Sequence, residues 1–463
     1  MHLRSRLVQA VSASAEQVGQ AGSEPSGPQR SMGLGTATAL VIASMVGTGV
    51  FTTTGLLVEL LPSAPAAIAC WAVGGVMALC GALSYAELGA AMPENGGEYH
   101  FLSRLFHPCV GFLSAWVSLI VGFGAPLAAV ALAFGQYAAV FAPGLSPRVA
   151  GGTLILVLSL VNAWRVTTSA GLQNVLTYGK VLLIVGFIVL GGWLGSLDRL
   201  VAPVAAPLLP TVTSSGFAVG LLLVSFSYFG WNAAAYVAGE VRDPGRVMPR
   251  SLALGTAVVM VLYVLLNAVF FAAAPLSALA GKVEVGHVAA VALLGSGGGK
   301  ALSAVVTLGL LSTVGALIVT GPRVYEAVGA EVPRLSWLAA RSGRGGPGRA
   351  IALQSSLALV MLATAGFEAL LTYIGFTLSI FSGLTVLGVF VLRRRTGGAV
   401  PFRTPGYPVT PLVFVALMAW MVVHAVVRTP GTAAAGAVTV VVGLGVYVAS
   451  TRRAAGRRRR DGG

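Results

Sequence analysis

Charged side chains are scarce in this sequence. Only 9% of its 463 residues are Asp, Glu, Lys or Arg, whereas 56% are hydrophobic and the mean hydropathy is +0.87. Soluble domains carry about 25% charged residues. A chain with so little charge is excluded as a soluble globular protein, and its composition predicts an all-α polytopic membrane protein.

Acidic residues are scarcer than basic ones, with 14 against 29, and the net charge is +15. Nucleic-acid-binding proteins also carry such an excess, but here the basic residues lie in short loops between apolar runs and in the C-terminal tail, as the positive-inside rule predicts. With the N-terminus inside and about twelve alternating spans, the outer segments hold only Arg148, Arg199, Lys282, Lys300 and Arg428. We therefore expect a multi-pass protein of the cell membrane (plasma or inner), with cytoplasmic termini, contact with the lipid bilayer and no nucleic-acid partner.

Cysteine and histidine are also too few for several kinds of site. The three cysteines, Cys70, Cys80 and Cys109, form no disulfide framework and have no metal-ligand spacing. The five histidines are scattered and form neither a metal site nor an acid–base set. Because no nucleophile–base constellation is present either, the sequence predicts no enzyme, no metal and no cofactor.

Apolar runs are abundant, and two of them are interrupted. The run 33–61 has the glycine-rich stretch 44–51 in its middle, and the run 216–241 is interrupted at 226–232. Glycines and small hydroxyl residues favour an unwound backbone over a packed helix. An unwound backbone is tolerated at membrane depth only where it faces protein, water or a ligand. Each interruption therefore predicts a broken helix beside a binding site.

A single glycine-rich stretch more often marks close helix packing than a ligand site, but two at corresponding places in two halves of a chain favour a transporter's substrate site. Five spans per half insert the second half upside down, which predicts a five-plus-five inverted repeat with broken helices 1 and 6. The predicted organisation is a disordered cytoplasmic N-terminal tail (1–32), a first repeat with helices 1–5 (33–194), an outer connection (195–215), a second repeat with helices 6–10 (216–392), helices 11 and 12 (393–450) and a basic cytoplasmic tail (451–463).

The chemistry of a broken helix indicates the kind of ligand. Free N–H groups at one half-helix attract a carboxylate, and free C=O groups at the other accept from an ammonium, so a site with both fits an α-amino acid. The carboxylate is expected at the backbone of residues 46–49, the ammonium at carbonyls near Met45 and of residues 226–229, and the Asn232 amide on backbone that the break leaves free. The predicted substrate-binding residues are Met45, Val46, Gly47, Thr48 and Gly49 in the first interruption, and Phe226, Ser227, Tyr228, Phe229, Gly230 and Asn232 in the second.

Lys180 lies within an otherwise apolar span, where a charge indicates function by default. It is a candidate for holding a coupled proton or for standing where other carriers place Na⁺. The alternative is a side chain that reaches the membrane surface. Ser312 and Thr313 in the eighth span are candidates for lining a cation site, or they pack between helices.

Three residues are candidates for gating. Phe226 is large enough to close over a ligand, although a lone Phe is more often a packing residue. Glu87 and Glu240 each end a span near the inner face. Ordinary surface carboxylates are as good an interpretation of these two as gating ion pairs with Arg104, Arg242 or Arg323.

Several motifs together resemble the amino acid–polyamine–organocation transporters, most of all the L-type amino acid transporters and bacterial amino acid permeases. In chain order they are Ser44-Met45-Val46-Gly47-Thr48-Gly49-Val50-Phe51, Tyr85-Ala86-Glu87-Leu88, Glu94-Asn95-Gly96-Gly97-Glu98-Tyr99, Gln173-Asn174 with Lys180, and Phe226-Ser227-Tyr228-Phe229-Gly230-Trp231-Asn232 followed by Glu240, Pro244 and Pro249. The resemblance implies secondary transport by alternating access on the five-plus-five fold. It also implies Gly47, Thr48 and Gly49 on the substrate carboxylate, Phe226 as the gate, and Lys180 at the place of a sodium site, where it ties the two helical bundles together or carries the coupled proton.

Two features narrow this prediction. The loop 142–149 has no cysteine, whereas animal L-type members use one there to bind a partner glycoprotein, so we expect no disulfide-linked heavy chain. Neither interruption contains Asp or Glu, which favours a neutral amino acid. The sequence therefore predicts a permease for neutral amino acids that works as a proton symporter or as an exchanger. The alternatives are a cationic amino acid or polyamine antiporter and a transporter-like amino acid sensor.

Overall fold

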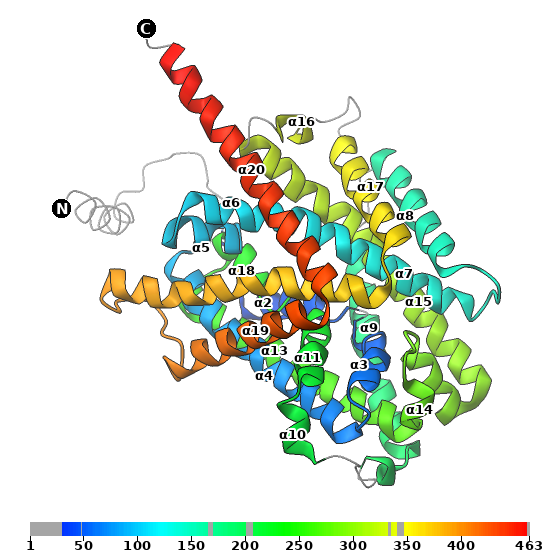
Figure 1. The fold of residues 1–463 in the computed structure, drawn as a ribbon. Helices are drawn as coiled ribbons and strands as arrows, with labels where there is room; N and C mark the ends of the chain where they lie inside the picture. Colours follow the sequence, from blue (N-terminus) through cyan, green and yellow to red (C-terminus); the bar gives the residue numbers. More distant parts are fainter. Residues whose placement is uncertain are drawn as a thin grey trace.

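The computed structural model describes residues 30–47, 49–164, 170–200, 207–331, 335–339 and 347–460, which form helices joined by short connections (Figure 1). Within these residues the only β-type pairing is one isolated parallel bridge between Met32 and Val241. The α-helices are α2 (Leu34–Met45), α3 (Thr54–Leu60), α4 (Ala64–Ala91), α5 (Gly97–Leu105), α6 (Pro108–Val117), α7 (Ala125–Ala139), α8 (Pro147–Trp164), α9 (Ala170–Leu194), α10 (Leu208–Val212), α11 (Ser215–Tyr228), α12 (Ala233–Tyr236), α13 (Pro244–Ala273), α14 (Leu276–Leu279), α15 (Val285–Glu331), α16 (Ser336–Ala339), α17 (Gly348–Thr364), α18 (Phe367–Thr396), α19 (Val409–Arg428) and α20 (Pro430–Arg460). Short turns of other helix types are η2 (Gly49–Phe51), the π-helical η3 (Ser118–Gly124), η4 (Leu197–Arg199) and η5 (Ala238–Glu240).

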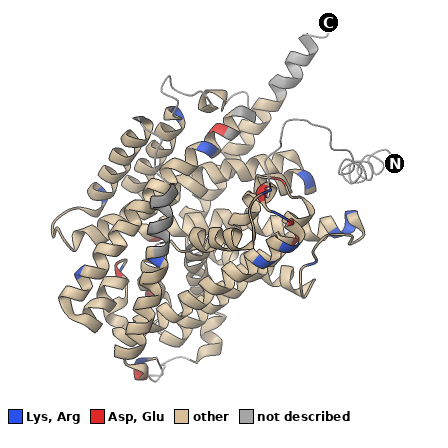
Figure 2. Ribbon diagram, turned by 180° about the vertical axis from the view of Figure 1, so that it is seen from behind, with Lys and Arg blue, Asp and Glu red and all other residues tan. Residues whose placement is uncertain are grey.

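In the part of the chain that the structure describes, eight helical stretches are long and apolar enough to cross a membrane, the first of them including the break after α2. They cover Leu34–Phe51, Ala64–Ala91, Pro108–Ala139, Pro244–Ala273, Val285–Glu326, Phe367–Thr396, Val409–Arg428 and Pro430–Thr451. Four shorter apolar helices lie where the other spans are predicted, at Pro147–Ala163, Gly179–Leu194, Ser215–Tyr228 and Gly348–Thr364. Figure 2 shows charged residues mainly at helix ends and in connections. The chain is an all-α multi-pass membrane protein, as its composition predicts, while the count of twelve spans and the repeat boundaries stay predictions.

Both interrupted runs are broken helices, which confirms this part of the prediction. α2 ends at Met45 and is followed by η2 and α3. α11 continues through Tyr228, so the second break starts after this residue rather than at Phe226, and α12 begins at Ala233. Between them Gly230 has a φ of 103°, a left-handed conformation that favours glycine.

Two long helices, α4 and α13, support the broken ones. α13 packs against α2 and against α4. α11, the first part of the second broken helix, packs against α4, α18 and α19. α4 is capped by Ser63, whose Oγ accepts from the Ala66 N–H (3.4 Å). The C-terminal end of α13 is capped by Arg199, whose guanidinium donates to the carbonyls of Ala272 (3.1 Å) and Ala273. The broken helices therefore lie against long, capped neighbours.

The helices differ from the predicted spans at two places. α20 continues through part of the predicted basic tail to Arg460, and α15 contains a kink at Gly295, where φ is 74°. Of the predicted N-terminal tail, residues 1–29 lie outside the described residues. Thr48 in the first break also lies outside them.

Candidate functional site

The two helix breaks touch each other. A Cβ placed on Gly49 would lie 2.6 Å from the Ser227 Oγ, and a Cβ placed on Gly230 would lie 2.5 Å from the Ser44 carbonyl oxygen. Both distances are well below van der Waals contact, so glycine is needed at both positions for this approach. The structure thus brings together the two stretches that the sequence singles out, Gly49 with Ser227 and Gly230 with Ser44.

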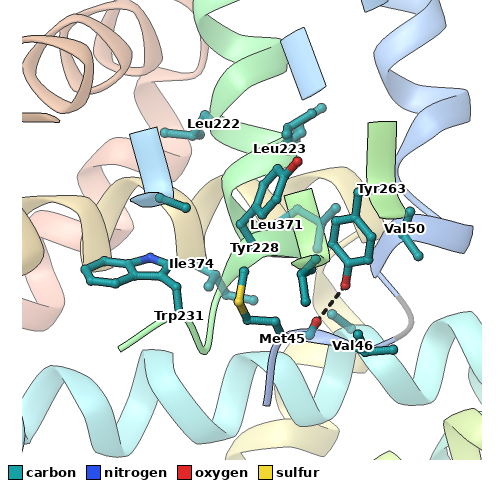
Figure 3. Close-up of a cluster of buried hydrophobic side chains, with 14 of the residues drawn as sticks. Met45, Val46, Val50, Leu222, Leu223, Tyr228, Trp231, Tyr263, Leu371 and Ile374 are labelled. Carbon is teal, nitrogen blue, oxygen red and sulfur yellow. Dashed lines mark hydrogen bonds between the residues drawn. The ribbon is translucent and has the colours of Figure 1, made fainter. Parts of the chain in front are cut away.

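The carbonyl at the end of α2 is already engaged by protein donors. Met45 O accepts hydrogen bonds from Gly47 N (2.7 Å) and from the Tyr263 hydroxyl on α13 (2.6 Å), as Figure 3 shows for Tyr263. A carbonyl oxygen has two acceptor positions, and these two bonds occupy both. Met45 O therefore has both acceptor positions occupied, and the expected ammonium contact at carbonyls near Met45 stays a prediction.

The backbone donors at the first break are partly engaged as well. Val46 N donates to Ile42 O (2.8 Å), and Gly47 N donates to Met45 O. Gly49 begins η2, and the first N–H groups of a helix have no partner within it. Among the described residues predicted to hold a carboxylate, Gly49 is the one whose position at a helix start suits that role.

Neighbouring helices hold the backbone beyond the first break in place. The hydroxyl of Tyr137 on α7 donates to Phe51 O (2.9 Å) and accepts from the N–H of Gly286 on α15 (3.2 Å). The hydroxyl of Thr54 donates to the side chain of Asn267 on α13. The spacing of these residues in the sequence does not indicate which groups they reach.

The residues of the second break have two kinds of surroundings. Ser227 Oγ lies 3.1 Å from the Thr53 Oγ1 and faces the first break. Tyr228, by contrast, is buried, donates to the Trp71 carbonyl (2.9 Å) and packs its ring against Tyr263 at 5.3 Å (Figure 3). Its hydroxyl is therefore engaged inside the protein, which fits a packing role better than a ligand contact.

The two phenylalanines of the interruption predicted at 226–232, Phe226 and Phe229, are partly buried and pack against the main hydrophobic core. Phe226 lies in the last turn of α11, and Phe229 follows the end of that helix. Its position next to the break keeps Phe226 as a predicted gate.

The Asn232 amide donates to a buried carboxylate, and its expected bond to backbone that the break leaves free stays a prediction. Its Nδ2 donates to the Glu98 Oε1 at 3.3 Å. Glu98 lies on α5, is 5% exposed, and also accepts from the hydroxyls of Tyr85 (2.6 Å) and Ser382 (3.1 Å). In the sequence, Glu98 is one acidic residue in a loop motif, and its burial beside the second break follows only from the tertiary packing.

Lys180 points into the protein toward α15. Its Nζ donates to the Thr313 Oγ1 at 2.9 Å, and Thr313 donates in turn to Gly309 O at 2.9 Å. Gly309 allows this approach, since a Cβ there would lie 3.3 Å from the Lys180 Cε. The Oγ of neighbouring Ser312 is buried without a hydrogen-bond partner among the described residues. The structure therefore brings together Lys180 and Thr313, and the lysine ties α9 to α15 rather than reaching the membrane surface.

Glu87 is fully buried and forms a bidentate ion pair, but not with one of the three arginines considered from the sequence. Arg393 on α18 donates to both of its oxygens, from Nε to Oε1 (2.6 Å) and from Nη2 to Oε2 (2.7 Å). The backbone N–H of Thr404 donates to Oε2 as well (2.7 Å). Arg104 pairs instead with the exposed Glu94 (2.9 Å).

Glu240, the other predicted gating carboxylate, contacts the chain that enters α2 through its backbone. Its carbonyl accepts from Met32 N (3.0 Å), and Arg242 N donates to Met32 O (2.9 Å). These two bonds form the isolated bridge between the chain entering α2 and the chain leaving η5. Within the part of the chain that the structure describes, the Glu240 side chain forms no ion pair with Arg104, Arg242 or Arg323.

Comparisons with known proteins identify the family. The chain matches the Amino acid permease family over residues 32–449. It is 29% identical to the serine/threonine exchanger SteT of Bacillus subtilis over 405 residues, which cover 85% of this chain and 90% of that protein. It is 28% identical to the mouse b(0,+)-type amino acid transporter 1 (87% and 84% covered) and 27% identical to the human large neutral amino acids transporter small subunit 2 (90% and 80% covered). These relatives are transporters and not enzymes, and because the family match spans most of the sequence, this chain belongs to the amino acid permease family.

Proposed function

We propose that this permease moves neutral amino acids across the cell membrane by alternating access, with the substrate bound between the two helix breaks. The observation that carries the proposal is the direct approach of the breaks, Gly49 to Ser227 and Gly230 to Ser44. Two broken helices that meet inside a bundle of membrane spans supply unpaired backbone groups to one small polar ligand. The relatives named as a serine/threonine exchanger and a large neutral amino acids transporter support the same substrate class.

The absence of charged residues from the two breaks favours a substrate with a neutral side chain. Segments 44–54 and 226–232 contain no Asp, Glu, Lys or Arg. The buried carboxylate beside the second break, Glu98, already accepts from neutral donors of the protein. A cationic substrate needs a carboxylate within the breaks, and neither segment supplies one. The breaks therefore suit the carboxylate and ammonium common to all amino acids, and no second charge.

We assign the substrate carboxylate to the backbone of Gly47, Thr48 and Gly49, with Gly49 as the position that starts a helix, and the Gly47 N–H must leave Met45 O to take part. The ammonium is assigned to the carbonyls that end α11, since the last carbonyls of a helix lack partners within it and Met45 O is engaged. Phe226, at that same end of α11, is assigned as the gate.

The remaining assignments concern coupling and the inner face. Lys180 joins α9 to α15 through Thr313, which supports a role as a tie between moving parts or as the carrier of a coupled proton. Glu87 and Glu240 are assigned to the inner gate through their contacts with Arg393 and Met32. The proposed location is the plasma or inner membrane with cytoplasmic termini, and no disulfide-linked heavy chain is expected.

Uptake into liposomes tests the function. The purified protein is reconstituted, and uptake of labelled serine, leucine and alanine is followed with and without an inward proton gradient, and with unlabelled amino acid inside. Arginine and putrescine are measured alongside. We expect uptake of the neutral amino acids alone. Uptake restricted to arginine or putrescine contradicts the substrate class, and binding without uptake contradicts transport and supports a sensor.

The variant Lys180→Ala distinguishes between the two roles proposed for the lysine, a structural tie and a carrier of the coupled proton. Loss of gradient-stimulated uptake with intact exchange supports proton carriage. Loss of both modes supports a structural tie. Unchanged uptake in both modes contradicts either role.

A further inference from the structure

The loop that precedes α5 holds the chain that follows the second break. Asn95 Oδ1 accepts from Gly239 N (2.9 Å), and Gly96 N donates to Tyr236 O (3.0 Å). Gly97 lies against the ring of Tyr236, where a Cβ would come within 2.8 Å of the Cδ1. Any movement of this half of the second broken helix must therefore break these contacts or carry the loop with it.

The buried Glu98 adds a further contact between the start of α5 and the second break. Its carboxylate accepts from Tyr85 on α4 (2.6 Å), Asn232 at the second break (3.3 Å) and Ser382 on α18 (3.1 Å), and it also accepts from Ser114 on α6. One buried carboxylate thus connects three helices to the break. Its four donors are neutral groups.

The charged groups around Glu98 are engaged elsewhere. The titratable groups that interact with it are two phenols, Tyr85 on α4 and Tyr236 after the second break, while α6 and α18 contribute the hydroxyls of Ser114 and Ser382. The ions on the same elements form their own pairs: Glu87 of α4 with Arg393 of α18, and Glu94 before α5 with Arg104 on it. The His100 ring on α5 lies 3.4 Å from the Glu94 carboxylate. In the described part of the chain no cation forms an ion pair with Glu98.

A buried carboxylate without a cation favours its neutral form. Burial raises the pKa of the Glu98 carboxyl, and the hydrogen bonds from Tyr85, Ser382, Ser114 and Asn232 act in the opposite direction. The site tolerates both protonation states, because a hydroxyl donates to an ionised carboxylate and accepts from a protonated one after it turns. The hydroxyls of Tyr85 and Ser382, which donate to Oε1, can therefore stay bonded to the carboxyl when it binds a proton.

From this juxtaposition we infer that Glu98 is a proton-binding site whose occupancy controls how firmly the chain after the second break is held. This inference rests on the proposed transport function and deepens it. Hydrogen bonds to an ionised carboxylate are stronger than those to a neutral one, so protonation weakens the bond from Asn232. A proton on Glu98 then favours release of the break, and by linkage the position of the break changes the proton affinity of Glu98.

The first test is the pH profile of transport by the whole protein in liposomes. Initial uptake of labelled serine is measured from pH 5 to pH 9, with equal pH on both sides, for the wild type, Glu98→Gln and Glu94→Gln. We expect the wild-type uptake rate to change with pH in a single titration. In Glu98→Gln this titration should be absent, so that the ratio of the variant's rates at low and high pH is about one. Glu94→Gln removes a carboxylate from the same loop and keeps the wild-type midpoint. A Glu98→Gln protein with the wild-type midpoint overturns the inference.

The second test separates titration from a purely structural role. Ser382→Ala removes one donor to the ionised form and leaves the carboxyl in place, so the midpoint should move up by about one pH unit. A lower rate with an unchanged midpoint shows a structural role and overturns the inference. This variant carries the test if Glu98→Gln does not fold. Wild-type uptake that does not depend on pH refutes only this inference, whereas a wild type without any amino acid uptake refutes the proposed function itself.

Discussion

The hydroxyl of Tyr263 on α13 donates a 2.6 Å hydrogen bond to the carbonyl of Met45, the last residue of α2. A tyrosine from a supporting helix thus satisfies the backbone where the first broken helix stops. The same ring packs against Trp71 (5.7 Å) and Tyr228 (5.3 Å), which fixes its direction. The shape of the first break therefore depends on a side chain more than two hundred positions away.

Tyr263→Phe should slow uptake by about tenfold, because a buried carbonyl that loses a partner costs about 1–3 kcal/mol. The matched control is Tyr228→Phe, which removes a hydroxyl from the same aromatic cluster but frees the Trp71 carbonyl instead. Initial uptake rates of labelled serine measure the difference. Equal effects of the two variants would show that Met45 O has no special role.

Gly49→Ala and Gly230→Ala should each abolish uptake. The added methyl would lie 2.6 Å from the Ser227 Oγ in the first case and 2.5 Å from the Ser44 carbonyl in the second, so the breaks must separate. Gly230→Ala should also destabilise the protein more, because its left-handed backbone strains an alanine. Gly445→Ala on α20 is the control, since a Cβ there meets nothing within 4 Å. Uptake by either variant at the rate of this control would exclude contact between the breaks as a requirement.

Thr313→Val should reproduce part of the effect of Lys180→Ala. The substitution keeps the shape of the side chain and removes the oxygen that accepts from the Lys180 Nζ. We expect uptake to fall by about tenfold, since an amine that loses its acceptor in a partly buried position costs about 1.5 kcal/mol. Thr307→Val on the same helix is matched, because Thr307 donates only to its own helix at Ser303 O. If the two threonine variants behave alike, the Lys180 contact is not part of transport.

Glu87→Gln should clearly lower the melting temperature of the protein in detergent. It leaves the Arg393 guanidinium, whose side chain is 16% exposed, without its buried carboxylate, a change that costs about 3 kcal/mol. Glu94→Gln breaks an exposed pair with Arg104 and should cost less than about 1 kcal/mol. The melting temperatures of the two variants are measured side by side. Similar decreases would show that the buried Glu87–Arg393 pair stabilises the protein no more than the exposed Glu94–Arg104 pair.

Local patterns in the sequence predict the two breaks and the inward-pointing lysine. Glycines and hydroxyl residues within apolar runs mark the ends of α2 and α11, and a lone charge in a span marks Lys180. The partners of the carboxylates could not be predicted in the same way. Glu87 meets Arg393 across 306 positions and Asn232 meets Glu98 across 134. Such pairs depend on how helices pack, and the sequence offers several equally charged or polar candidates for each.

The bridge between Met32 and Val241 ties the start of the first broken helix to the end of the second. The Met32 N–H donates to Glu240 O, and the Met32 carbonyl accepts from Arg242 N, so two main-chain hydrogen bonds join the segments at this point. A displacement of the segment that enters α2 therefore acts on the segment that follows η5 through main-chain hydrogen bonds, without any side chain in between.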